Sequence, residues 1–93
     1  MPPLEKGPRE KTWRFKAGDS VPGWLMRQTN CALTFDRAVL VIERDASFDL
    51  YPAAAMMIDD VMILADILSR RRGADVEHVR PITLHTRPRE QSK

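Results

Sequence analysis

The residues with the most direct chemical potential are three aspartates, Asp59, Asp60 and Asp66, in an otherwise apolar stretch. Paired carboxylates can bind a metal ion or transfer protons. On a helix, Asp59 and Asp66 lie two turns apart on one side, and no histidine or glutamate accompanies them. This spacing indicates a solvated helix face, with neither a metal site nor an acid–base pair.

The chain also contains Cys31, His78 and His85, the residue types that bind zinc. A zinc site needs three or four ligands at a recognisable spacing, and these three are scattered. To act as a nucleophile, Cys31 would need a neighbouring base, which the sequence does not identify. We therefore expect Cys31 to be a small buried residue near a strand. The four glycines form no phosphate-binding pattern. We therefore expect no catalytic residue, no metal and no cofactor.

Two basic segments resemble nucleic-acid-binding surfaces in their composition. In residues 13–16, aromatic residues alternate with Arg and Lys, as in platforms that stack bases and contact phosphates. On a strand, however, this alternation sends the aromatic residues to one face and the cations to the other, which favours core packing. Arg70, Arg71 and Arg72 could contact phosphates or complement the negative end of a helix dipole. Nucleic acid is thus a possible partner of these three arginines.

The net charge of +2 is unevenly distributed. Residues 1–16 and 70–93 are basic, whereas residues 17–69 carry three basic and eight acidic groups. Because residues 1–11 and 86–93 are rich in charged and turn-forming types, we expect two flexible basic arms around a single domain of residues 12–85. The arms could contact nucleic acid or an acidic protein, or could only be solvated.

The stretch between these arms contains a strongly predicted helix, at about residues 53–72. Pro52 suits the first helical position and Gly73 the residue just past the end. At about 100° per residue, six apolar residues form one core-facing stripe. They are Ala54, Met57, Val61, Leu64, Ala65 and Leu68.

This helix has more apolar surface than one stripe can account for. Met56, Ile63 and Ile67 line one flank, and Ile58 and Met62 line the other. The stretch is too short and too charged to span a membrane, so we expect another protein chain to cover it. Asp60 lies within this apolar surface. If the interface buries Asp60, its carboxylate needs an arginine partner from the other chain. Otherwise Asp60 lies at the rim of the interface. The expected interface residues are Met56, Asp60, Met62, Ile63 and Ile67.

The other ordered residues predict a small sheet. Residues 38–42 are apolar at every position, which is typical of a strand that is buried on both faces. One helix covers one face, so the tryptophan segments or a partner must cover the other. Residues 13–16 and 24–28 predict shorter strands, and 82–85, which follow Pro81, predict an edge strand.

These patterns together predict an α+β fold: a small, mainly antiparallel sheet packed against one long helix in the C-terminal half. The single cysteine and the absence of an apolar leader favour the cytoplasm. Eleven arginines against four lysines suggest a bacterial or phage source. We expect a non-enzymatic protein-interaction module, such as an accessory, inhibitor or regulatory subunit. It would act as a homodimer or within a larger protein complex. The alternative is a small nucleic-acid-binding protein that uses Arg70–Arg72 and the basic arms.

Overall fold

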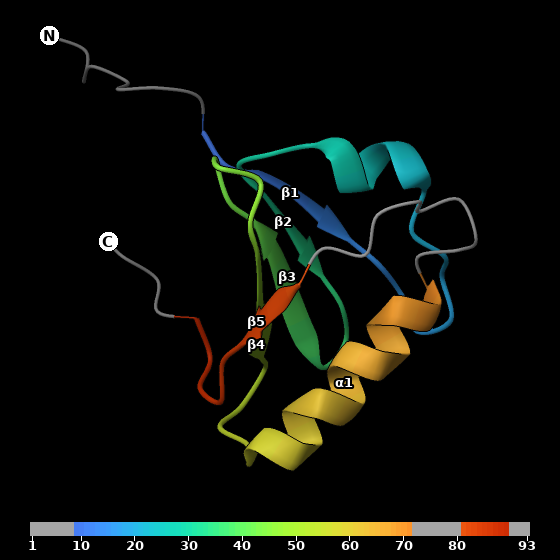
Figure 1. Cartoon of the computed structure of the whole chain (residues 1–93). Coiled ribbons are helices and arrows are strands. Elements are labelled where there is room, and N and C mark those ends of the chain that lie inside the picture. The colour runs from blue at the N-terminus through green and yellow to red at the C-terminus, as the bar shows by residue number, and fades with distance from the viewer. Residues whose placement is uncertain (1–8, 72–80, 90–93) are drawn as a thin grey trace, which may run out of the picture.

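The computed structural model describes residues 9–71 and 81–89, which form a five-stranded sheet with one α-helix (Figure 1). The strands follow one another across the sheet in chain order: β1 (Lys11–Arg14), β2 (Cys31–Thr34), β3 (Ala38–Ile42), β4 (Phe48–Pro52) and β5 (Ile82–Leu84). The two helical elements are the 3-10 helix η1 (Gly23–Arg27) and the α-helix α1 (Ile58–Arg71). The predicted α+β class, with its helix in the C-terminal half, is confirmed.

The sheet is antiparallel at its centre and parallel at both edges. Strands β2, β3 and β4 are antiparallel neighbours, whereas β1 runs parallel to β2 and β5 runs parallel to β4. A parallel pair needs a crossover connection, and η1 and α1 lie in these two crossovers. Both crossovers join strands of the same direction and step across the sheet the same way. Because such crossover connections are right-handed, both crossovers lie on the same face of the sheet.

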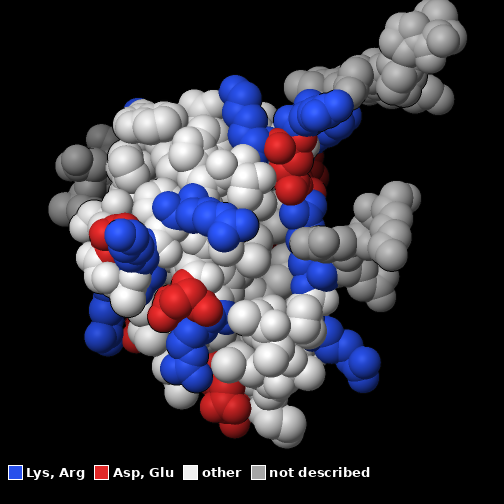
Figure 2. All heavy atoms as spheres, turned by 180° about the vertical axis from the view of Figure 1, so that it is seen from behind, with Lys and Arg blue, Asp and Glu red and all other residues white. Residues whose placement is uncertain are grey.

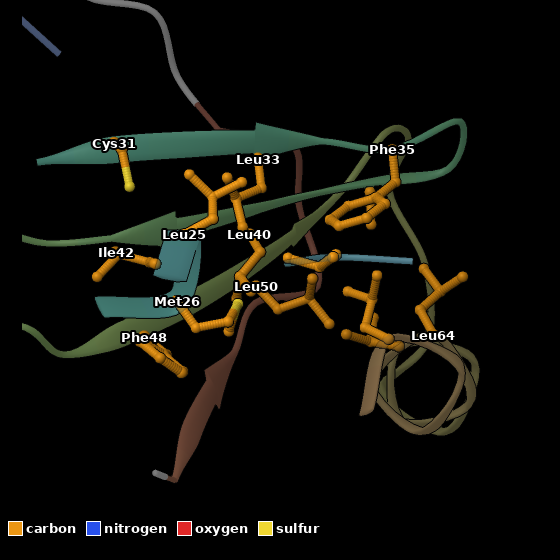
Figure 3. Close-up of a cluster of buried hydrophobic side chains, with 14 residues drawn as sticks. Leu25, Met26, Cys31, Leu33, Phe35, Leu40, Ile42, Phe48, Leu50 and Leu64 are labelled. Atoms are coloured by element: carbon orange, nitrogen blue, oxygen red, sulfur yellow. The ribbon is translucent and has the colours of Figure 1, made fainter. Parts of the chain in front are cut away.

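The core lies between this face and the two helical elements. Leu33, Leu40 and Leu50 are direct neighbours on β2, β3 and β4, and each is at most 1% exposed. Leu25 from η1 and Leu64 from α1 belong to the same cluster and point toward these leucines (Figure 3). Burying each such side chain stabilises the fold by about 1.5–3 kcal/mol. The core therefore fixes both crossovers to the same face.

The segment before α1 differs from the sequence prediction. The helix begins at Ile58 and not at Ala53, because the chain first completes β4. Pro52 is the last residue of that strand and pairs with Ala38. The amide of Ala53 then donates to the carbonyl of Arg37 at 2.9 Å. Backbone pairing with the neighbouring strand thus overrides the helix propensity of the three alanines that follow Pro52.

The segment Trp24–Gln28, which was predicted as a strand, mostly belongs to η1. A short apolar run does not distinguish a strand from a helical turn. Here Leu25 and Met26 are buried in the core, whereas Trp24 is exposed and meets Trp13 edge to face at 6.2 Å. Trp13 also packs against the core cluster. The tryptophans therefore cover the core side of the sheet and not its other face.

Candidate protein interaction surface

Helix α1 packs on β4 and β5 with one side and exposes apolar side chains on the others. Val61, Leu64 and Leu68 form its buried side. The exposed large apolar residues at or just before the helix are Met57 (74%), Ile58 (46%), Met62 (54%), Ile63 (58%) and Ile67 (41%). Single exposed apolar residues are common, but a group on one element marks a surface that another molecule can cover.

The structure places four of the five predicted interface residues on this helix. Asp60, Met62, Ile63 and Ile67 are all exposed. Met56 lies before the helix, packs against the core cluster, and donates its amide to the carbonyl of Thr86 at 2.8 Å. The predicted flank of the helix therefore lacks Met56, which instead anchors the chain before the helix begins.

The exposed apolar side chains of α1 lie on two flanks of the helix. Asp60, Ile63, Ile67 and Arg70 recur at intervals of three, four and three residues, so they lie within about 80° of arc on one side of the helix. We call these four residues the seam. Ile58 and Met62 lie on the other flank. The seam is acidic at its N-terminal end and basic at its C-terminal end, with two isoleucines between them.

A narrow groove runs beside the C-terminal half of the seam. Its volume is about 80 Å³, and it separates α1 from the turn between β2 and β3. It is lined by Phe35, Asp36, Arg37, Ala38, Leu64, Ile67, Leu68 and Arg71. One wall is firm, because Phe35 stacks on Phe15 with ring centroids 5.3 Å apart. The groove can therefore accept a small apolar side chain next to Ile67.

The arginines at the end of α1 make contacts within the chain. Arg70 pairs with Asp66 at 3.0 Å, and the guanidinium of Arg71 lies 5.5 Å from the ring centroid of Phe35. Arg72 lies outside the described residues. Figure 2 shows acidic and basic side chains interspersed over the face seen from behind, without a continuous basic stripe among the described residues. These contacts give Arg70 and Arg71 structural roles that need no phosphate.

A second group of polar residues, which the sequence prediction missed, lies on the sheet face away from the helices. Tyr51 and His85 stack with ring centroids 4.1 Å apart, and His85 Nε2 lies 2.8 Å from Asp49 Oδ1. The amide of His85 donates to the carbonyl of Leu50 at 2.9 Å, which extends the pairing of β5 with β4. These contacts fasten the short edge strand to the sheet.

The same face also carries an ion pair between distant parts of the chain and a pair of neighbouring carboxyl groups. Arg89 donates two hydrogen bonds to the carboxylate of Glu10, at 2.8 and 2.6 Å, and these bonds hold the pKa of Glu10 below its ordinary value. Burial raises the pKa of Glu43, and a hydrogen bond with Asp49 and the charge of Asp49 raise it further. We call Glu10, Glu43, Asp49, Tyr51, His85 and Arg89 the polar cluster.

The polar cluster borders an open hollow of about 460 Å³ that is lined by Tyr51 and residues 85–89. The other candidate zinc ligands do not meet here. Cys31 is buried in the core, where burial raises the pKa of its thiol, and His78 lies outside the described residues. Within residues 9–71 and 81–89, no three His, Cys, Asp or Glu side chains are placed to hold a metal ion.

Comparisons with known proteins supply no functional assignment. Neither the protein-family models, nor the curated proteins, nor the solved structures give a match to this chain. Among the described residues, no helix has the length and apolar character needed to cross a membrane.

Proposed function

We propose that this protein is a non-enzymatic interaction module that binds a protein surface through α1. The exposure of Met62, Ile63 and Ile67 on one short helix carries the proposal. Covering such side chains is favourable by about 25 cal/mol for each Å² of apolar surface removed from water. The partner is a second copy of the chain or a subunit of a larger complex, for which this protein would be an accessory, inhibitor or regulator.

The composition of the surface supports this role. Methionine is flexible and adapts to imperfectly complementary surfaces, and Met57 and Met62 are both more than half exposed. Acidic and basic residues flank the isoleucines of the seam, as polar residues flank the apolar centre of many protein interfaces. The exposed surface of α1 and of the residue before it therefore combines adaptable methionine side chains with a seam of isoleucines between charges that can select a partner.

The test compares wild-type protein with Ile63→Asp by light scattering and by pull-down from host extract. We expect the wild type to self-associate or to retain a specific partner, and I63D to lose that association while its circular dichroism stays unchanged. Thr29→Asp is the matched control, because it adds the same charge at an exposed loop position outside α1. A wild-type protein that is monomeric at hundreds of micromolar and retains no partner would contradict the proposal.

The alternative function, nucleic-acid binding through Arg70, Arg71 and Arg72 and the basic arms, makes a different prediction. Replacing the three arginines with alanine would remove up to three phosphate contacts. The slope of log affinity against log salt for an oligonucleotide would then flatten by about 0.7–0.9 per contact. A protein-interaction module would show no measurable oligonucleotide affinity, either in the wild type or in this variant. A flattened slope with weakened oligonucleotide binding would instead favour the alternative.

A further inference from the structure

We infer that the partner of α1 is a second copy of this chain, packed with the two helices antiparallel along the seam. This inference rests on the proposed function and specifies its partner. It starts from the spacing of Asp60, Ile63, Ile67 and Arg70, whose three-four-three intervals are those of residues that face a neighbouring helix in a coiled coil. All four side chains are exposed in the single chain.

The seam is complementary to itself in one orientation. When two copies are antiparallel about a two-fold axis midway between Ile63 and Ile67, each Ile63 faces the partner's Ile67. The same axis places each Asp60 opposite the partner's Arg70. The two pairs of residues on each chain thus generate two apolar contacts and two ion pairs, as an isologous interface requires.

The parallel orientation has the opposite electrostatics. It would place Asp60 against the partner's Asp60 and Arg70 against the partner's Arg70, which are repulsive contacts. It would also align the two helix dipoles, whereas the antiparallel arrangement opposes them. In the single chain Arg70 pairs with Asp66 at 3.0 Å. Because a guanidinium has five N–H donors, it can keep this contact and also bind a second carboxylate.

Two further features favour the seam over the other flank. Ile58 and Met62 continue along the helix to Ala65 and Ser69, and the charges nearest to this flank, Asp59 and Asp66, are both acidic, so it offers no pair of opposite charges for a second copy. The groove beside Ile67 lies only on the seam side. In the antiparallel pair, the side chain that meets Ile67 is the partner's Ile63, so this groove is placed to receive it.

The helix length limits the strength of this dimer. Fourteen residues span about 21 Å, at 1.5 Å per residue. One such contact belongs to the small class of interfaces, below about 1,200 Å², which form weak or transient complexes. We therefore expect a weak dimer that forms only at micromolar or higher concentrations of the protein.

Disulfide trapping tests the arrangement in the full chain. In an antiparallel pair, Asp60→Cys in one chain and Arg70→Cys in the other bring the two thiols together. Two copies of D60C would keep their thiols about ten residues apart along the helix, or about 15 Å, which is too far for a disulfide. We expect a mixture of D60C and R70C to form a mixed disulfide dimer, and each variant alone to form none. The wild type measures any background from Cys31, which is buried.

Charge exchange gives a second readout. Asp60→Arg should weaken the dimer about tenfold, since it replaces two attractive pairs with two repulsive ones. Adding Arg70→Asp to the same chain should restore the wild-type dissociation constant. Ile58→Asp, on the other flank, should leave it unchanged.

Disulfide-linked dimers in a sample that contains only D60C would overturn the antiparallel arrangement. A wild-type monomer at hundreds of micromolar would overturn the second copy as partner. If that monomer still captured another protein in a way that depends on Ile63, the proposed function would stand without this inference. If the capture of that protein did not depend on Ile63, the proposed function and this inference would both fail.

Discussion

Glu43→Gln should stabilise this protein at neutral pH, although it removes a charge from a surface. Glu43 lies on the same sheet face as Asp49, one strand away, and the two side chains are hydrogen bonded. That bond requires a proton on one of the two carboxyl groups, and above the raised pKa of Glu43 the pair loses this proton and becomes repulsive. A glutamine supplies the donor permanently through its amide group.

The magnitude and its pH dependence follow from the position of the pair. Like charges on adjacent strands destabilise a sheet by about 0.2–1 kcal/mol. Removing this repulsion in E43Q should raise the Tm of a domain of this size by about 1–8 °C. The raised pKa means that folded Glu43 binds its proton more tightly than the unfolded chain does. Its favourable contribution is therefore present below about pH 4.5 and is lost as the pH rises through the raised pKa.

The assay is thermal unfolding of wild type and E43Q, followed by circular dichroism from pH 3.5 to 8. The Tm difference should be largest at neutral pH and should vanish in acid, where wild-type Glu43 is protonated. In an Asp49→Asn background the gain should shrink, because its cause is the neighbouring charge. Asp45→Asn is a matched control of opposite sign, since Ser47 donates two hydrogen bonds to Asp45 and lowers its pKa. A lower Tm for E43Q than for the wild type at pH 7, or a rise in Tm that does not change with pH, would refute this reasoning.

Two more predictions concern the stability of the fold. Arg89→Met should cost about 0.5–1 kcal/mol at pH 7, measured by urea unfolding. Because folding lowers the pKa of Glu10, this cost should disappear as the pH falls through that lowered value, and a cost that persists in acid would contradict the ion pair. Leu50→Ala should cost about 2–5 kcal/mol by the same assay, because Leu50 is fully buried, and a loss below 1 kcal/mol would contradict its central place in the core.

The helix and the central strand were predictable because their signals are local. Residues 38–42 are apolar throughout, and β3 has these bounds. The carboxylates and arginines at the two ends of α1 match the helix dipole, and its last turn lies close to its predicted end. The start of the helix was not predictable in the same way. It depends on hydrogen bonds that Ala53 and Met56 make with Arg37 and Thr86, which are distant in the sequence.

Strand β4 and the polar cluster were missed for a related reason. Phe48, Leu50 and Pro52 alternate as core-facing residues with Asp49 and Tyr51, which is a period-two pattern. Pro52, however, suits the start of a helix as well as the end of a strand, and the helix interpretation removed the segment from the sheet. Without β4, Asp49 and Tyr51 have no common face with His85, so the cluster could not be anticipated.

The position of the polar cluster changes the argument for association. The sequence offered two apolar surfaces that required cover: the flanks of the helix and the second face of residues 38–42. On that second face Val41 is only 1% exposed, and Asp49 is its cross-strand partner. Glu43 follows Val41 on the same face, so side chains of this chain already cover the strand there. The case for a partner chain therefore depends on α1 alone. Because the seam and the polar cluster lie on different sides of the sheet, variants of the seam can change association without disturbing the contacts that hold β5 in place.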